Sequence, residues 1–233
     1  AQSLEARGIP ALRIHYLPNW AEDIYKSADT PVEFADYRGF RILFAGNLGS
    51  AQSLETLLGA AGRLRGRCDI HWLIAGDGLM RTWLADQIRK RGLETTVTLL
   101  GRHPLAKMPA FFAGADALLV TLCSDPVFAL TIPSKIQSYL AAGRPILGAL
   151  DGEGARIIGE SGAGMVVAAE DAAALAVAAT QMAATTAAER AKMGRRGREY
   201  FEAHFERGRL LYRLETWMHQ LTSRSNAHTD TRG

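Results

Sequence analysis

A hydroxyl, an ammonium group and the start of a helix come together in one short stretch of this sequence. Residues 128–147 read FALTIPSKIQSYLAAGRPIL, and Pro133 suits the first turn of a helix. Ser134 and Lys135 then lie beside backbone N–H groups that have no acceptor within the helix. Such a helix start favours an anion, so we expect it to hold a diphosphate. The plainer alternative is that Thr131 caps the helix and Lys135 is a solvated lysine.

Glycine-containing turns follow three predicted strands. Residues 46–49 read GNLG, residues 76–78 read GDG, and Gly101 precedes Arg102. Ligands of open parallel sheets bind where the carboxyl ends of the strands meet, so these turns are expected to lie at one edge. Each turn alone is most often only a tight turn. Together with the helix start at Ser134, they indicate a phosphate-bearing ligand.

The elements that must position these residues are strands alternating with helices. Stretches that are apolar throughout, and therefore read as buried strands, occur at residues 41–46, 71–76, 97–101, 116–122, 145–149 and 164–168. Apolar residues at helical spacing separate them. This pattern indicates a parallel sheet covered on both faces. We predict an α/β fold with a doubly wound, Rossmann-like parallel sheet, followed by C-terminal helices.

The domain boundaries follow from the same pattern. We expect a lead-in over residues 1–37, the Rossmann-like domain over 38–170, and C-terminal helices over 171–221. Thr186 and Glu189 have the spacing of a capping box for a long helix within the last of these. Residues 222–233 carry almost no apolar side chains, so we expect a disordered tail there.

Composition excludes several classes of protein. The 233 residues carry a formal charge of only +3, so no nucleic-acid partner is expected. Cys68 and Cys123 lie far apart without metal-ligand spacing, which argues against a disulfide framework or a zinc site. No apolar run reaches the roughly 18 residues of a membrane span. We predict a cytoplasmic protein that is at most peripheral to the inner membrane.

Four segments resemble, in this order, the C-terminal, donor-binding domain of family 4 glycosyltransferases, one half of a GT-B fold. The segments are FAGNLGSAQSLETLL, HWLIAGDG, VTLLGRHPLAKMPAFFAGADALLV and FALTIPSKIQSYLAAGRPIL. Within that family the resemblance is to bacterial enzymes that transfer L-fucosamine-type sugars in O-antigen and capsule biosynthesis. It implies a nucleotide-diphosphate-sugar donor, UDP- or dTDP-linked, transfer with retention, and no metal or other cofactor. It also implies an N-terminal acceptor domain before Ala1 and a lipid-linked acceptor at the membrane surface.

The resemblance assigns roles to individual residues. It places the first glycine loop and the second against the diphosphate, the segment at Arg102 and His103 along the nucleobase, and Ser134 with its neighbours on the phosphates. Lys135 is the expected catalytic residue, because it would stabilise charge on the departing diphosphate. Asp125 could approach the donor sugar or form a turn before Pro126. The predicted substrate-binding residues are Gly46, Asn47, Gly49, Gln52, Gly76, Gly78, Arg102, His103, Asp125, Thr131, Ser134, Lys135 and Ser138.

The first departure from the family lies in the first glycine loop. Many relatives carry Arg and Lys where this sequence has Asn47 and Gln52. Two cations are thereby lost. Lys135 remains the strongest candidate for countering the charge of a diphosphate.

The second departure is the loss of two glutamates that the family spaces as E-x7-E. Leu130 and Ser138 occupy these positions. Ser138 or Gln137 could replace the glutamate that binds the ribose only through weaker, neutral hydrogen bonds. Either ribose recognition is rebuilt or donor binding is lost.

Of three other possible functions, the sequence argues against two. The lost carboxylates and cations suit a degenerate, non-catalytic nucleotide-binding or assembly module, which nucleotide affinity would distinguish. A nicotinamide-dependent oxidoreductase would need G-x-G-x-x-G, and GNLGSA lacks that spacing. A sugar-nucleotide epimerase would need acid and base residues that we do not find. We expect the isolated chain to bind nucleotide without transferring sugar.

Overall fold

Six parallel strands form the sheet at the centre of the molecule. The computed structural model describes residues 2–26, 30–32, 34, 37 and 39–229. The strands are β1 (Phe40–Ala45), β2 (Ile70–Ala75), β3 (Val97–Gly101), β4 (Ala117–Thr121), β5 (Ile146–Ala149) and β6 (Gly164–Val167). Their order is β3-β2-β1-β4-β5-β6, which is that of a doubly wound fold. The structure therefore confirms the predicted fold class.

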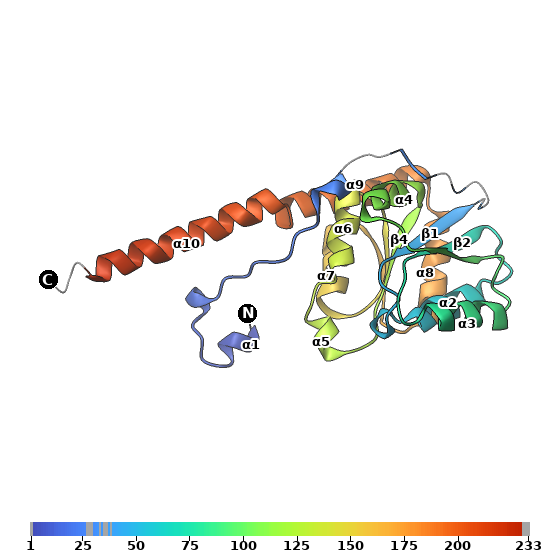
Figure 1. The fold of residues 1–233 in the computed structure, drawn as a ribbon, viewed down its shortest axis with the longest axis horizontal. Helices are drawn as coiled ribbons and strands as arrows, with labels where there is room; N and C mark the ends of the chain where they lie inside the picture. The colour runs from blue at the N-terminus through green and yellow to red at the C-terminus, as the bar shows by residue number, and fades with distance from the viewer. Residues whose placement is uncertain (1, 27–29, 33, 35–36, 38, 230–233) are drawn as a thin grey trace.

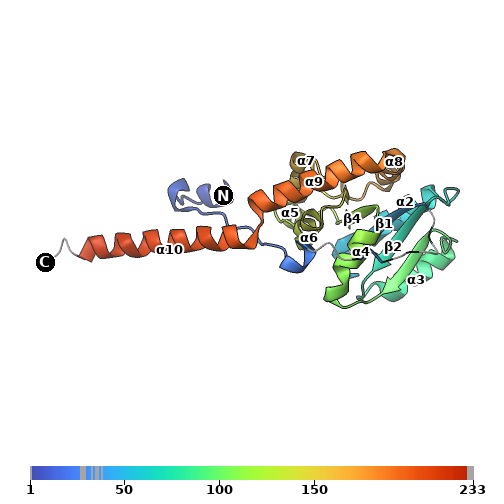
Figure 2. The same cartoon turned by 90° about the horizontal axis from the view of Figure 1, so that it is seen from above.

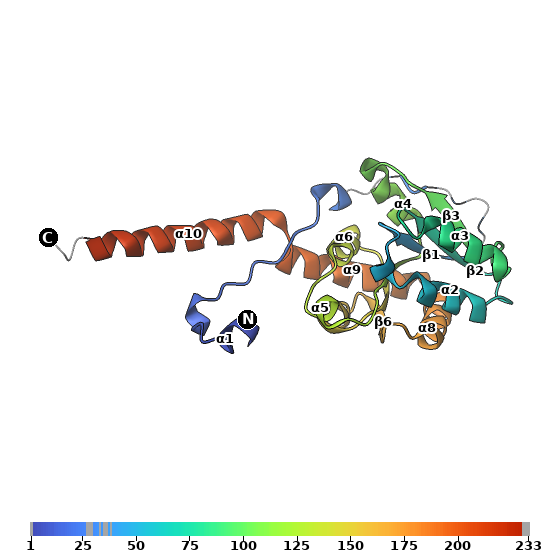
Figure 3. The same ribbon diagram turned by 60° about the horizontal axis from the view of Figure 1, so that its bottom comes forward.

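Alternating residues of β1 face two separate cores. Ile42 and Phe44 pack toward one face of the sheet, and Leu43 and Ala45 toward the other. The first face is covered by α2 (Leu54–Arg63), α3 (Arg81–Lys90) and α8 (Ala172–Ala184). The second is covered by α4 (Met108–Gly114), α6 (Ser134–Ala142), α7 (Gly152–Ser161) and α9 (Ala187–His204). Figure 3 shows α2 and α8 on one side of the strands and α4 on the other.

Local sequence signals account for several helix ends. Thr186 and Glu189 form the expected capping box, with the Glu189 N–H donating to the Thr186 hydroxyl at 3.2 Å. Asp171 caps α8 by accepting a hydrogen bond from the Ala174 N–H. Short helical segments occur at α1 (Gln2–Glu5), η1 (Ala11–Arg13), η2 (Asp23–Lys26), η3 (Ser50–Gln52), η4 (Leu105–Lys107) and α5 (Pro126–Ala129).

The C-terminal helix α10 (Arg207–Thr229) extends away from the sheet, as Figure 1 and Figure 2 show. It continues past residue 222, where we expected order to end, and no Gly or Pro between there and Thr229 interrupts it. Residues 230–233 of the expected tail lie outside the described residues, as do several residues of the expected lead-in. Among the described residues, no helix combines the length and apolar character needed to cross a membrane.

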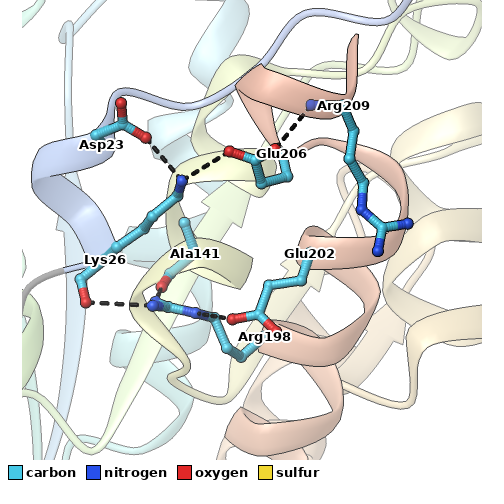
Figure 4. Close-up of polar contacts among 7 residues, drawn as sticks. All are labelled: Asp23, Lys26, Ala141, Arg198, Glu202, Glu206 and Arg209. Atoms are coloured by element: carbon cyan, nitrogen blue, oxygen red, sulfur yellow. Dashed lines mark hydrogen bonds and ion pairs between the residues drawn. The ribbon is translucent and has the colours of Figure 1, made fainter. Parts of the chain in front are cut away.

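The lead-in is bound to the C-terminal helices through η2. Lys26 Nζ lies 2.7 Å from Asp23 and 3.0 Å from Glu206, which precedes α10. Arg198 of α9 donates to the backbone oxygens of Lys26 and Ala141 and pairs with Glu202 (Figure 4). These contacts hold η2 against α6 and α9.

Candidate functional site

A cavity of about 1140 Å³ lies at the carboxyl ends of β1, β2 and β3. It contains most of the predicted binding residues: Gly46, Asn47, Gln52, Gly76, Gly78, Arg102, His103, Ser134, Lys135 and Ser138. Nine residues that were not among the predicted binding residues also line it: Tyr25, Ala45, Ala75, Asp77, Leu79, Leu105, Met108, Phe112 and Tyr139. The structure does not place Gly49, Asp125 or Thr131 in the cavity wall.

The glycine turns after β1 and β2 pack directly on each other. Gly76 has φ of 154°, and a Cβ there would lie 1.9 Å from the carbonyl oxygen of Gly46. A Cβ at Gly78 would meet the carbonyl oxygen of Leu48 at 2.6 Å. The Leu48 N–H also donates to the Asp77 carbonyl at 2.8 Å. Glycine is therefore required by this close approach of the two turns.

Lys135 is held inward by neutral groups. Its Nζ lies 3.8 Å from the centroid of the Phe44 ring and donates a hydrogen bond to Oε1 of Gln52. A Cβ on Gly46 would meet Lys135 Cε at 2.7 Å, so the glycine also makes room for the lysine stem. Burial lowers the pKa of Lys135 from 10.5 to about 7. An anion entering the cavity would reverse that shift.

The start of α6 differs by one residue from the predicted start. Pro133 occupies the N-cap position and makes no side-chain cap bond, and Ser134 is the first helical residue. Thr131 does not cap this helix, because its hydroxyl donates to the Phe128 carbonyl at 3.1 Å. The alternative in which Thr131 is the cap is therefore wrong. Ser134 and Lys135 remain in the first turn, beside the cavity.

Two further predicted residues have structural roles. Asp125 caps α5, its Oδ1 accepting from the Val127 N–H at 2.7 Å, which favours the turn-forming alternative for this residue. Gln137 is buried and donates to the carbonyl of Asn19 at 3.0 Å, so it fixes the lead-in and does not line the cavity. Leu130, at one lost glutamate position, is 77% exposed and also lies outside the cavity wall.

An aromatic stack forms the wall nearest α6. Tyr25 stacks on Phe112 with ring centroids 5.4 Å apart, and Phe112 meets Tyr139 edge-on at 5.2 Å. The Tyr139 hydroxyl accepts from the Ala45 N–H at 3.1 Å and lies 3.3 Å from the Ala45 oxygen. Burial raises the pKa of the Tyr139 hydroxyl. Burial also raises the pKa of Tyr25, although a hydrogen bond with Ser138 partly lowers it.

The outer end of the cavity lies at the β3 turn. His103 Nε2 lies 2.9 Å from the Leu100 carbonyl, and its ring lies 4.5 Å from that of Phe111. Arg102 is exposed beside it. Asp77 is the sole carboxylate among the described residues of the cavity wall, against the two cations Arg102 and Lys135. This excess of positive charge suits an anionic ligand.

The described residues contain no cluster of three or more His, Cys, Asp or Glu side chains arranged to hold a metal ion. The polar side chains of the described cavity wall are instead one ammonium, one guanidinium, one imidazole, one carboxylate, amides and hydroxyls. Such groups can bind a phosphate-bearing ligand directly.

The sequence profile of the family described as glycosyl transferases group 1 matches residues 39–185. The chain belongs to this family. It is 33% identical over 160 residues to the probable glycosyltransferase WbjE of Pseudomonas aeruginosa, covering 64% of this chain and 38% of that protein. It is 29% identical over 146 residues to the putative colanic acid biosynthesis glycosyl transferase WcaI of Escherichia coli strain K12, covering 59% of this chain and 35% of that protein. The chain thus spans less than two fifths of either relative.

Solved structures of the same fold extend the comparison. Anabaena HepE, in complex with UDP and glucose, superposes with a TM-score of 0.72 at 18% identity, covering 95% of this chain and 60% of that one. The C-terminal domain of the group 1 family protein LpcC from Francisella tularensis gives 0.61 at 15% identity, covering 78% of this chain and 98% of that domain. At these low sequence identities, the similarity is evidence for the fold alone. The chain therefore has the fold of a GT-B C-terminal domain.

Proposed function

We propose that the cavity binds the nucleoside diphosphate part of a nucleotide-sugar donor. The observation that carries this proposal is the environment of the Lys135 ammonium. This ammonium is half-buried at a helix start and has no carboxylate partner among the described residues. An unpaired, partly desolvated cation is unfavourable in the free protein, and a diphosphate would supply the missing charge. UDP in the structure of HepE, a protein of similar fold, supports the same ligand class.

The proposed reaction is sugar transfer with retention of configuration, in the assembly of a bacterial surface polysaccharide. As the bond between the sugar and the diphosphate breaks, negative charge develops on the departing phosphate. Lys135, the first turn of α6 and the amides of the glycine turns stabilise that charge. The colanic acid role named for WcaI and the similarity to WbjE support the polysaccharide context. An L-fucosamine-type sugar and a UDP- or dTDP-linked donor belong to this proposal.

We propose that the acceptor binds outside this chain. The chain spans less than two fifths of its curated relatives, and we assign acceptor binding to the length that it does not span. On this proposal the isolated chain binds nucleotide without transferring sugar. The acceptor is lipid-linked, and the protein works on the cytoplasmic side of a membrane surface.

The test is calorimetric titration of the chain with UDP, dTDP and GDP. We expect one of the three nucleotides to bind. Lys135→Ala should weaken the affinity for it about tenfold or more, which is the effect of losing a charged hydrogen bond. Lys90→Ala is the matched control, because Lys90 lies exposed in the last turn of α3 and outside the cavity. Binding that is unaffected by Lys135→Ala would contradict the proposed role of the lysine.

A degenerate, non-catalytic module is the second candidate. The neutral residues Asn47, Gln52, Leu130 and Ser138 at positions where the family carries charge favour it. Absence of binding by all three nucleotides would support this candidate over donor binding.

A further inference from the structure

Three arginines gather at the edge of the sheet opposite the cavity, where the strands begin. Arg41 is the second residue of β1, Arg144 lies two residues before β5, and Arg190 belongs to the first turn of α9. Asp116 directly precedes β4. Because β1, β4 and β5 are neighbours in the sheet, residues far apart in the chain meet at this edge.

Asp116 is the carboxylate that these arginines share. Arg41 Nε donates to its Oδ2 at 2.8 Å, and the Arg41 backbone N–H donates to the same oxygen at 3.0 Å. Arg190 Nη2 lies 4.0 Å from Oδ1, a weaker contact. Among the described residues, Arg144 has no carboxylate within ion-pair distance. Three guanidinium groups are therefore set against one carboxylate.

Neutral groups hold the two less well paired arginines in place. Arg144 donates a hydrogen bond to the Ala113 carbonyl. Arg190 donates to the Thr185 carbonyl, and its Cζ lies 5.2 Å from the centroid of the Phe40 ring. A guanidinium has five N–H donors, so these contacts leave donors on each group for a further acceptor.

The excess of positive charge lies in partly buried side chains. The side chains of Arg41, Asp116 and Arg190 are 29%, 20% and 19% exposed. Burial lowers the pKa of Arg144, the charge of Asp116 opposes that effect, and the nearby charge of Arg41 adds to it. Like charges that are partly desolvated are unfavourable without a counter-ion. After Asp116 is counted, two positive charges remain, which matches a dianion.

We propose that Arg41, Arg144 and Arg190 bind a small free oxyanion of the phosphate type, at a second site separate from the nucleotide cavity. Guanidinium groups suit such an anion because their paired N–H donors match its oxygens. The partial burial of the arginines favours a small free anion over a phospholipid headgroup, which a membrane presents only to exposed side chains. The bound anion joins the starts of β1, β5 and α9, so it stabilises the domain. This inference does not depend on the proposed function.

The experiment measures thermal unfolding at pH 8, where inorganic phosphate is mostly a dianion. It uses the Lys135→Ala chain, so that phosphate bound by the cavity lysine does not contribute. We expect 10 mM phosphate to raise the unfolding midpoint by about 2–4 °C over sodium chloride of equal ionic strength. Arg144→Gln and Arg190→Gln should each remove most of this rise. Arg195→Gln, at an exposed position of α9, should keep it.

A purely structural role for the cluster gives a different result. The two glutamine variants would then lower the midpoint equally in phosphate and in chloride, and the rise caused by phosphate would persist in both. That outcome would overturn the proposal, as would the absence of any rise before the cluster is changed. If Arg144→Gln does not fold by circular dichroism, Arg190→Gln decides the question.

A phospholipid headgroup is the other source of the same chemistry. Sedimentation with vesicles of phosphatidylcholine, with and without phosphatidic acid, tests it. We expect no binding to the phosphatidic acid vesicles that depends on Arg144. Binding that Arg144→Gln abolishes, in a protein whose unfolding midpoint free phosphate does not raise, would assign the cluster to a membrane lipid and overturn the proposal.

Discussion

The ammonium group of Lys135 lies over the ring of Phe44, with Nζ 3.8 Å from the ring centroid. Gln52 accepts its hydrogen bond. Within the described part of the chain, this half-buried cation therefore contacts neutral groups and no carboxylate. A cation–π contact and a neutral amide only partly compensate for lost hydration. The buried ammonium therefore destabilises the free protein and stabilises its complex with an anion.

Replacing this lysine should stabilise the free protein. Burial holds the pKa of Lys135 near 7 in the folded state, against 10.5 ordinarily. Between these values the unfolded chain holds a proton that the folded chain lacks, so the free energy of unfolding rises with pH across this window. Lys135→Met removes that rise and increases the free energy of unfolding at pH 7 by up to about 4 kcal/mol.

Urea unfolding at pH 7 and pH 9.5 checks this, with Lys90→Met as the exposed control. Identical pH dependence in Lys135→Met and the unchanged protein would show that Lys135 keeps its ordinary pKa.

Nucleotide binding should take up a proton at Lys135. A diphosphate beside the ammonium raises its pKa, so affinity for UDP falls as pH rises above about 7, by up to about tenfold per unit. At pH 8.5 a terminal phosphate, with a pKa of about 6, is fully ionised, so uptake there comes from the protein. Calorimetry in HEPES and in Tris, whose ionisation enthalpies differ, measures the uptake. Equal heats in the two buffers, or uptake that persists in Lys135→Ala, would contradict this assignment.

Gly76→Ala should disrupt the two glycine turns. A Cβ at Gly76 lies 1.9 Å from a backbone oxygen that cannot move independently, and φ there is 154°. We expect a loss of about 3 kcal/mol or more in the free energy of unfolding, together with weaker nucleotide binding. Gly62→Ala is the control, since that helical glycine has no neighbour within 4 Å and the change should add about 0.5 kcal/mol. Equal stability of the two variants would show that the turns tolerate a side chain.

Glu206 should stabilise the junction between the lead-in and α10. Hydrogen bonds from the N–H groups of Arg209 and Gly208, and then Lys26, lower the pKa of Glu206 from 4.5 to about 2. Glu206→Ala should reduce the free energy of unfolding at pH 7 by about 1 kcal/mol, as the loss of a helix cap does. The depressed pKa means that this stabilisation is complete above about pH 4.5 and is lost as pH falls toward 2.

Unfolding measured at pH 7 and pH 3 tests the role of Glu206, with Glu199→Ala on the exposed face of α9 as control. A difference between Glu206→Ala and the unchanged protein that stays constant over this range would exclude the ionised carboxylate as its source.

The strands, the helices that follow them and the capping box at Thr186 were all predictable, because each depends on neighbours within a few residues. The meeting of Gly46, Gly76 and Lys135 was predictable for a different reason, since parallel strands bring their carboxyl ends to one edge. The sequence alone determined these features.

The tertiary structure decided which side chains reach the cavity. Asp125 and Thr131 have local partners that no spacing rule distinguished from a ligand contact. Tyr25 gave no signal at all, because its place in the cavity wall depends on distant contacts: its ring stacks on Phe112, and its neighbour Lys26 pairs with Glu206, 180 residues away. Contacts at such separation are set by packing of whole elements and leave no periodic pattern in the sequence.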